Sequence, residues 1–417
     1  MSTPSFARLG SANAYDNALR NISQRQTALS SLQDNLTSGK RVVRASDDPT
    51  SAAQAERALT RLSRIATDQR ALASQTNSIA MAESTLGDVT SALQSFRALV
   101  VSAGSGAFTQ KDRQTVAQQL QGLRDHVFNL SNQKDTNGQS LFSALGSALT
   151  PFVGPTAEPQ DYTFDGLPGQ VASGTVSIPF ALDGDSAFML QTARDGAYNV
   201  SMGNSNTTLR SDPITVTNAA LLTGASYAIS NIVISAGTLP GTSKATYDLT
   251  ETPAGSSTAS AAVSTVGPDY VSTSSAIPLS APGLSVNITG AFTGVTVSIT
   301  PNPSIFSVLD NAIRDIGGAS SNMSASQAVS QALANIDLGA NRVSAVRGQA
   351  GELLNRADRI SDNQSKRAVQ VESDRSRAED LDMVKGLSDF QNQQTGHQVA
   401  LQSYAQIQKL SLFNYIS

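Results

Sequence analysis

Six apolar residues lie seven positions apart in one stretch of this chain: Ile65, Leu72, Ile79, Leu86, Leu93 and Val100. A spacing of seven returns a helical side chain to nearly the same face, so the row predicts one long helix with a single packed face. Capping oxygens and a proline in the segment Ser46-Asp47-Asp48-Pro49 predict that this helix begins there. We expect it to continue to about Val101.

Two further apolar rows lie near the ends of the chain. The first contains Tyr15, Ala18, Ile22, Leu29, Leu32 and Leu36, and it stops at Gly39, a plausible C-cap. The second alternates at three and four residues and contains Val343, Val346, Ala350, Leu353, Ala357 and Ile360, followed by Met383, Leu387, Phe390, Leu401 and Tyr404. We therefore expect the two helical ends to pack together, with another domain inserted between them.

Shorter signals divide the remaining helical sequence. Gly104-Ser105-Gly106 should break the long helix, and Thr109 with Asp112 resembles a capping box that starts the next one. That next helix carries Val116, Leu120, Leu123 and Val127 on one face. Asn137-Gly138 is a turn signal, and helix should return at Ile305.

The middle of the chain has a different character. Residues from about Pro151 to Pro303 are rich in Gly, Ser, Thr and Ala and contain few Lys or Arg. Alternating runs at 175–178 and 295–299 read as half-buried strands. We expect an antiparallel β domain, or two small ones, with a slight acidic excess.

Composition excludes several classes of function. The 417 residues carry a formal net charge of −4, with charged residues at 15%, which indicates neither a nucleic-acid partner nor an anionic membrane. The sequence has no Cys, so disulfides and thiolate chemistry are excluded. The first ten residues lack the pattern of a cleaved signal peptide, and no stretch is apolar enough to span a bilayer.

We expect no enzymatic activity, no catalytic or cofactor-binding residue and no metal site. His126 and His397 are the only histidines and lack the companions of a zinc protease motif. Asp183-Gly184-Asp185 has too few oxygen ligands for a calcium loop and reads better as a polar turn. Gly104-Ser105-Gly106 follows no strand and precedes no Walker lysine, so a turn is again expected.

Five blocks of sequence follow one another in a characteristic order. They are Ser38-Gly39-Lys40-Arg41-Val42 with Ser46-Asp47-Asp48-Pro49; Ala103-Gly104-Ser105-Gly106 leading to Asp112-Arg113; Asp135-Thr136-Asn137-Gly138 through Leu141-Phe142; Ser376-Arg377-Ala378-Glu379-Asp380-Leu381-Asp382; and Tyr404-Ala405-Gln406 to Leu410-Ser411-Leu412-Phe413-Asn414-Tyr415-Ile416. Together these blocks resemble the flagellar hook-associated protein 3 family of the flagellin superfamily. The resemblance covers about residues 10–150 and 305–417.

The resemblance implies a mainly α protein with a β-rich insertion. The expected architecture is a flagellin-like helical bundle built from the N- and C-terminal segments, with an outer β domain. Residues 1–42 with 376–417 would be terminal helices of an inner tube, residues 43–150 with 304–375 the supporting bundle, and residues 151–303 a variable outer domain.

The implied function is structural: an adaptor between hook-side proteins and the flagellin filament. Its implied partners are further copies in a ring, a hook-side hook-associated protein, flagellin, and an export chaperone with the flagellar type III export apparatus. No nucleic acid or membrane insertion is implied, and the chain would be secreted to the hook–filament junction. Filament flagellin is the alternative, but flagellins usually have an alanine at the position that Pro49 occupies after Asp48. A surface adhesin, or a hydrolase within the β-rich insertion, fits the sequence less well.

The subunit-contact candidates are apolar residues of the terminal helices and one arginine: Ile22, Leu29, Leu32, Leu36, Arg377, Phe390, Leu401, Tyr404, Leu412, Phe413 and Tyr415. The apolar rows could instead pack only on each other. The charged run from Asp374 to Asp382 is either a solvated helix face or a polar joint between the inner and middle layers.

Overall fold

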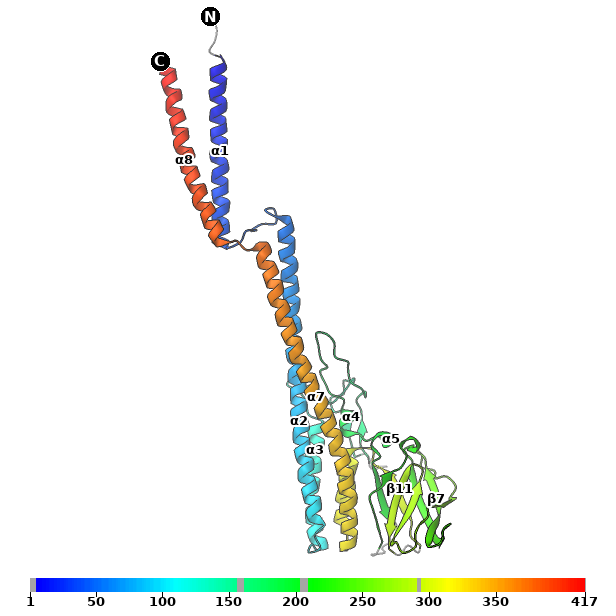
Figure 1. Cartoon of the computed structure of the whole chain (residues 1–417). Coiled ribbons are helices and arrows are strands. Elements are labelled where there is room, and N and C mark those ends of the chain that lie inside the picture. Colours follow the sequence, from blue (N-terminus) through cyan, green and yellow to red (C-terminus); the bar gives the residue numbers. More distant parts are fainter. Residues whose placement is uncertain (1–4, 156–160, 203–208, 291–293, 417) are drawn as a thin grey trace. The chain divides into compact units, whose positions relative to one another are not determined.

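The computed structural model describes residues 5–155, 161–202, 209–290 and 294–416. Within these ranges, side chains are described from residue 16 to residue 406. The fold is mainly helical with a β-rich insertion, as predicted (Figure 1). The chain forms two compact units. We call Met1–Arg70 with Ser361–Ser417 the terminal unit, and Ala71–Ile360 the central unit.

The terminal unit is built entirely of helices and their connections. It contains α1 (Ser5–Ser38), the first part of α2 (Pro49–Ala103), the last part of α7 (Asn322–Glu379) and α8 (Met383–Ile416). Helix α1 ends just before Gly39, whose φ of +70° is a left-handed conformation that a glycine adopts without strain. Helices α1 and α8 pack against each other, which confirms that the two ends of the chain come together (Figure 1).

The helical part of the central unit follows the predicted caps. Helix α3 (Gln110–Ser131) begins at Thr109, which forms the predicted capping box with Asp112. Helix α6 (Ile305–Gly318) begins after Ser304, whose hydroxyl accepts a 3.0 Å hydrogen bond from the Ser307 amide. A capped start satisfies backbone amides that have no partner inside the helix.

The heptad row of α2 forms the core of the central unit. Leu72, Ile79, Leu86, Leu93 and Val100 are all buried, together with most of the predicted row on α7. Ile65, which lies in the terminal unit, is only half-buried. Ion pairs between Arg347 and Glu83 (2.7 Å) and between Arg97 and Asp337 (2.9 Å) show that α2 and α7 run antiparallel.

An aromatic cluster attaches the segment that follows α3 to the bundle. Here the chain forms β1 (Phe152–Val153), β2 (Thr163–Phe164), α4 (Gly184–Phe188) and α5 (Thr192–Asp195). Phe152 and Phe188 lie 5.7 and 5.8 Å from Phe306 of α6, measured between ring centroids. These contacts make residues up to Ala197 part of the helical core, while the sheet-lined core begins at Tyr198.

The predicted strand at 175–178 is wrong. Residues 175–178 form no strand; instead Ile178 is buried in the helical core and its amide donates to Gln75 Oε1 of α2 at 3.2 Å. Arg356 Nη2 of α7 donates to the carbonyls of Ser173 and Gly174. The apolar alternation therefore reflects one anchor residue on the bundle and no pairing with another strand.

The remaining insertion folds into two antiparallel sheets among the described residues. One has the order β3-β12-β6-β7-β8, with β9 also on β7; the other has the order β10-β11-β4, with β5 also on β11. The strands are β3 (Tyr198–Met202), β4 (Arg210–Ser211), β5 (Thr215–Val216), β6 (Ser226–Ala236), β7 (Thr242–Thr252), β8 (Val263–Val266), β9 (Tyr270–Val271), β10 (Ala276–Ala281), β11 (Leu284–Thr289) and β12 (Val297–Pro301). A 3₁₀ turn, η1 (Ala219–Leu221), lies between β5 and β6.

The expected strand at 295–299 is confirmed with a shift, since β12 begins at Val297 and continues to Pro301. Its inward residues Val297 and Ile299 alternate with more exposed neighbours, and the paired strands β10 and β11 alternate in the same way. The alternation arises because successive side chains of a strand point to opposite faces. The inward faces of the two sheets share one apolar core.

Candidate assembly surface and polar joint

A short backbone bridge in the terminal unit joins the end of α1 to the end of α7. Lys40 and Asp380 pair as antiparallel residues, the Leu381 amide donates to the Gly39 carbonyl at 2.9 Å, and Lys40 also forms an ion pair with Glu379. The left-handed Gly39 turns the chain so that this pairing can form. Two of the sequence blocks that resemble the family thus meet here.

Arg41 holds three segments together. Its amide donates to the Glu379 carbonyl at 2.7 Å, and Nη2 donates to the Ala378 carbonyl at 2.7 Å at the end of α7. The same guanidinium contacts Asp48 Oδ2 at 3.3 Å and Ser51 Oγ at 3.1 Å at the start of α2. One arginine therefore fixes the linker, the start of one long helix and the end of the other. We call the contacts of residues 39–51 with 378–381 the polar joint.

Within the predicted capping segment Ser46-Asp47-Asp48-Pro49, Asp48 is the residue that caps α2. Its Oδ1 accepts from the amides of Thr50 and Ser51, and its Oδ2 accepts from the Ser51 hydroxyl at 2.6 Å. The Ser51 and Thr50 hydroxyls, followed by the Ser51 amide, lower the pKa of Asp48 far below its usual value. The carboxylate therefore stays ionised over the whole physiological range and holds the helix start.

Glu379 is the central acid of the joint. The hydrogen bond from Lys40 lowers its pKa most; burial opposes this, and the hydrogen bond from Arg375 adds to the lowering. Arg375 bridges Glu379 Oε2 at 2.9 Å and Glu372 at 2.7 Å, and these partners raise its own pKa. The acidic run thus forms ion pairs within the chain, in which a buried Glu379 and a half-buried Arg375 contact the more exposed Lys40 and Glu372.

Arg377, the charged subunit-contact candidate, lies differently. Its side chain is 70% exposed, and its partners among the described residues lie on its own helix: Asp374 at 3.1 Å and the Ser373 hydroxyl at 3.2 Å. It borders a groove of about 400 Å³ between α2 and α7, which Arg57 and Arg61 also line. Three arginines against one acid make this groove positive.

The apolar candidates are half-buried or exposed. Residues Ile22, Leu29, Leu32 and Leu36 of α1 and Phe390 and Tyr404 of α8 are half-buried, and Leu401 is 44% exposed. Val384, at 83% exposure, and Leu387 border an apolar groove with Leu36. The helices therefore pack on each other and still leave an apolar face open to the outside of this chain.

The remaining candidates lie beyond the described side chains. Leu412, Phe413 and Tyr415 have helical backbone in α8, but their side chains are outside the described residues. The sequence reasoning also left out Arg41 and Glu379 as site residues, although both lie in the family-like blocks. The sequence does contain a basic block with Lys40 and Arg41 and an acidic block with Glu379 and Asp380. It does not show that these two blocks contact each other in the fold.

The features considered for catalysis and metal binding have structural places. Asp183 caps α4 by accepting from the Asp185 amide and from the Ser186 hydroxyl at 2.7 Å. His126 is exposed on α3. Within the described residues, no group of three or more His, Cys, Asp or Glu is arranged to hold a metal ion. None of the described helices is long and apolar enough to cross a membrane.

Comparison with known proteins gives the two helical ends a family. The family model of the bacterial flagellin N-terminal helical region matches residues 11–146, and that of the C-terminal helical region matches residues 333–416. Flagellar hook-associated protein 3 of Salmonella typhimurium is 33% identical over 147 residues, which are 35% of this chain and 46% of that protein. The match thus spans about half the length of this relative.

Solved structures agree at the level of the fold. The crystal structure of flagellar hook-associated protein 3 from Legionella pneumophila has a TM-score of 0.57 at 20% identity and covers 76% of this chain and 97% of its own. A structure of the flagellar junction protein from the same organism has a TM-score of 0.53 at 21% identity, covering 73% and 98%. Because the two family models together match more than half of the chain, the protein belongs to the bacterial flagellin family.

Proposed function

We propose that this protein is a structural subunit of the bacterial flagellum that joins hook-side proteins to the flagellin filament. The observation that carries the proposal is the apolar face that α1 and α8 leave exposed after packing on each other. Contiguous exposed apolar surface is characteristic of proteins with a further binding partner. The likeness to hook-associated protein 3 in both sequence and fold supports the junction as the place where that partner is found.

Under this proposal the terminal helices bind neighbouring copies in a ring. Subunit contacts would be made by Ile22, Leu29, Leu32, Leu36, Phe390, Leu401, Tyr404, Leu412, Phe413 and Tyr415. Such contacts would bury surface that a single chain leaves open, and each fully buried Leu or Phe side chain contributes about 1.5–3 kcal/mol. The ring would then meet a hook-side hook-associated protein on one side and flagellin on the other.

The same surface explains why assembly would control the order of the termini. Ordering each residue of a helix costs on the order of 1 kcal/mol in backbone entropy, and half-buried side chains offset little of it. The ends of the chain would become fully ordered only when several copies cover one another. Well-protected amide hydrogens in α1 of the isolated protein would contradict this part of the proposal.

The proposed role also requires export from the cell. The chain would pass through the flagellar type III apparatus with a dedicated chaperone holding its apolar ends beforehand. By this route the protein would reach the hook–filament junction outside the cell, where its role would be structural and not enzymatic.

Deletion of the gene tests the junction role. We expect hooks without filaments in electron micrographs, and monomeric flagellin shed into the medium on immunoblots. Re-expression from a plasmid should restore the filaments. Intact filaments in a strain with no second copy of the gene would rule out the junction, whereas shortened filaments or filaments of changed composition would indicate a flagellin.

Arg377→Glu tests whether the positive groove contributes to assembly. Since Arg377 is exposed and pairs only along its own helix, the isolated protein should unfold at the same temperature as wild type. We expect assembly and motility to be impaired, because the charge that would face a neighbouring subunit is reversed. The matched control is Arg367→Glu, an exposed arginine ten positions earlier on α7. Wild-type motility of the Arg377 variant would remove Arg377 from the contact.

A further inference from the structure

The positive groove of the terminal unit carries charge that the chain leaves unused. It lies between α2 and α7 and has a volume of about 400 Å³. Its charged lining residues are Arg57, Arg61, Arg377 and Asp374. The buried Ala58 and Ala378 also line it, so small side chains form its base and leave room for a side chain from outside.

Two of the three arginines are unpaired within the described part of the chain. Asp374 is bound along its own helix, since Arg377 contacts it at 3.1 Å and Gln370 donates to it at 3.1 Å. The guanidinium groups of Arg57 and Arg61 are exposed and form no ion pair or hydrogen bond with another described residue. Because the two lie four positions apart on one face of α2, their like charges repel each other. A bound carboxylate would relieve this repulsion.

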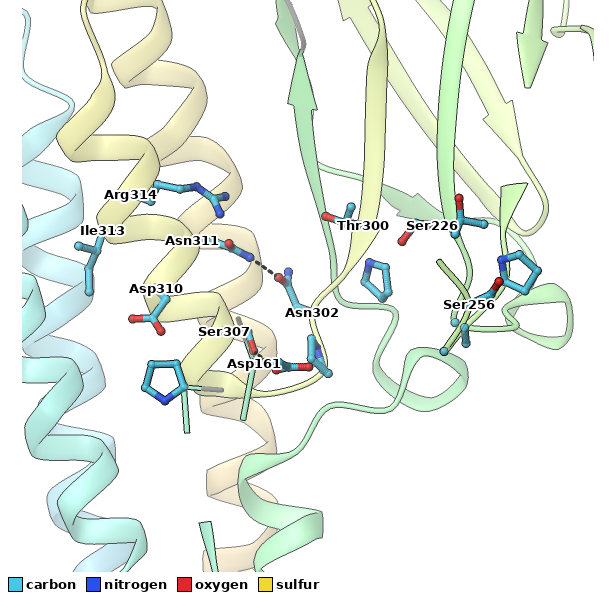
Figure 2. A pocket seen from close by; sticks show the side chains of 18 of the residues that line it. Asp161, Ser226, Ser256, Thr300, Asn302, Ser307, Asp310, Asn311, Ile313 and Arg314 are labelled. Carbon is cyan, nitrogen blue, oxygen red and sulfur yellow. Dashed lines mark hydrogen bonds between the residues drawn. The ribbon is translucent and has the colours of Figure 1, made fainter. Parts of the chain in front are cut away.

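The arginines that line a pocket of the central unit differ in this respect. Between α3, α6 and the ends of β6, β7 and β12, Arg124 forms an ion pair with Asp310 at 3.2 Å, and Arg314 forms one with Asp315 at 3.1 Å. Figure 2 shows Asp310 and Arg314 on α6 beside this pocket. There the chain supplies an acid for each arginine. At Arg57 and Arg61 the acid would come from another molecule.

The chain itself carries the complementary charge. Its 29 Lys and Arg and 33 Asp and Glu divide unevenly, with 16 and 13 in the terminal unit and 13 and 20 in the central unit. On the helices of the central unit, Asp88 of α2 and Glu352 of α7 are exposed and have no ion pair or hydrogen bond among the described residues. A groove on one copy that binds a different surface of the next is a head-to-tail contact, and such contacts can close into a ring.

We propose that this groove binds an acidic side chain from the central unit of a second copy of this chain, an inference that rests on the proposed ring of subunits. A guanidinium binds a carboxylate through two parallel hydrogen bonds, so the contact fixes the orientation of the neighbour as well as attracting it. The apolar face of α1 and α8 supplies no such orientation, because apolar burial has no preferred direction. The groove would therefore set how successive copies are aligned.

Chemical cross-linking tests which molecule occupies the groove. The site variant is Arg57→Lys with Arg61→Lys, which keeps both charges and gives each position a reactive amine. Surface structures are sheared from cells that carry the variant as their only copy and are treated with a water-soluble carbodiimide, which joins an amine to a carboxylate in contact with it. Immunoblots detect dimers, and mass spectrometry identifies the joined peptides. The matched control is Arg367→Lys, at an exposed position of α7 outside the groove.

We expect a dimer in the site variant that wild type and the control lack, with the new amine at position 57 or 61 joined to a peptide from residues 71–360 of a second copy. Replacing the joined acid by its amide should remove the dimer. Circular dichroism and motility show whether the site variant folds and assembles. If it does not assemble, the single variants, each of which keeps one native arginine in the groove, repeat the measurement.

Three results would overturn the occupant: no dimer, coupling only within one chain, or coupling to a different protein. Each of them leaves the junction role intact, because gene deletion tests that role separately. Absence of the wild-type chain from the sheared structures would instead overturn the proposed function, and this inference with it.

Discussion

The terminal and central units use parts of the same two long helices in opposite ways. In the central unit, α2 and α7 bury large aliphatic side chains such as Leu86, Leu93 and Val343 almost completely. In the terminal unit, the buried apolar residues among the described side chains are Val42, Ala55, Ala58 and Ala378. The terminal unit is held instead by the polar joint and by half-buried contacts between α1 and α8.

The difference shows that a heptad row predicts a face of a helix but not what covers it. Ile65 and Leu72 are successive members of one row on α2, yet the first is half-buried and the second is 3% exposed. The row is buried in the central unit, where α3, α6 and α7 form one core with it, and it is only half-buried at Ile65 in the terminal unit. Under the proposed function, the part that stays half-buried would be covered by another subunit.

Truncating one leucine in each unit should give the largest difference in stability between the two units. Leu86→Ala removes a fully buried side chain from the central unit and should destabilise that unit by about 2–5 kcal/mol. Leu32→Ala, on half-buried α1, should cost less than about 1 kcal/mol. Hydrogen exchange measured by mass spectrometry reports each unit separately. Equal costs at the two leucines would mean that the terminal unit has a core of its own.

Removing the hydroxyl of the buried Tyr162 tests how much its hydrogen bonds stabilise the central unit. The Tyr162 hydroxyl donates to Asp310 at 2.7 Å and accepts from Arg124, so Tyr162→Phe leaves both partners partly unsatisfied. We expect a loss of about 1–3 kcal/mol in urea unfolding of the central unit. Tyr270→Phe is the control, because no hydrogen bond of the Tyr270 hydroxyl is seen within the described residues. A loss equal to that of the control would show that the network adds no stability.

A smaller effect is expected at the polar joint. Arg41→Ala removes the contacts to Ala378, Asp48 and Ser51, and since Arg41 is half exposed it should cost about 1 kcal/mol. Exchange of amides near the joint should then be about fivefold faster, with no change in the central unit. Arg44→Ala, at an exposed arginine in the same linker, should change neither. Faster exchange throughout the central unit would show that the two units unfold together.

Acid should change the contributions of Glu379 in the terminal unit and Asp310 in the central unit in opposite directions, by the smallest amounts. The pKa of Glu379 is lowered by Lys40 and Arg375, so its contribution is present above the ordinary value of 4.5 and is lost as pH falls through the lower folded value. Burial raises the pKa of Asp310, so its contribution is present at low pH and is lost as pH rises through the raised value. NMR signals of Gly39 to Arg41 followed below pH 4.5 should show loosening in wild type and a flatter response in Glu379→Gln. An unchanged acid response in that variant would remove Glu379 as its cause.

Much of the helical fold was predictable, because its signals are local. The Thr109 capping box, the left-handed Gly39 and the start of α6 each depend on a few neighbouring residues. The strand at 175–178 was mispredicted because alternation over four residues also fits one anchored side chain. The order of the strands within the sheets could not be predicted, because β12 pairs with β3 and β6, which are separated from it by long stretches of sequence.

The candidate site was predictable only in part, for the same reason. The apolar faces of α1 and α8 follow from periodicity, and the structure leaves them partly exposed. The polar joint depends on a bond between Arg41 and Ala378, which are 337 positions apart. No local pattern connects such residues, and only the folded chain shows that the basic and acidic blocks meet.

The antiparallel packing of α2 on α7 also sets a delay during synthesis. The ion pairs that join these helices connect residues 240 and 264 positions apart. At the usual rate of translation, α2 would wait roughly ten to fifty seconds on the ribosome before its covering helix is made. Through that interval α3 can cover part of the row, but the part that α7 buries stays exposed to water unless another protein binds it.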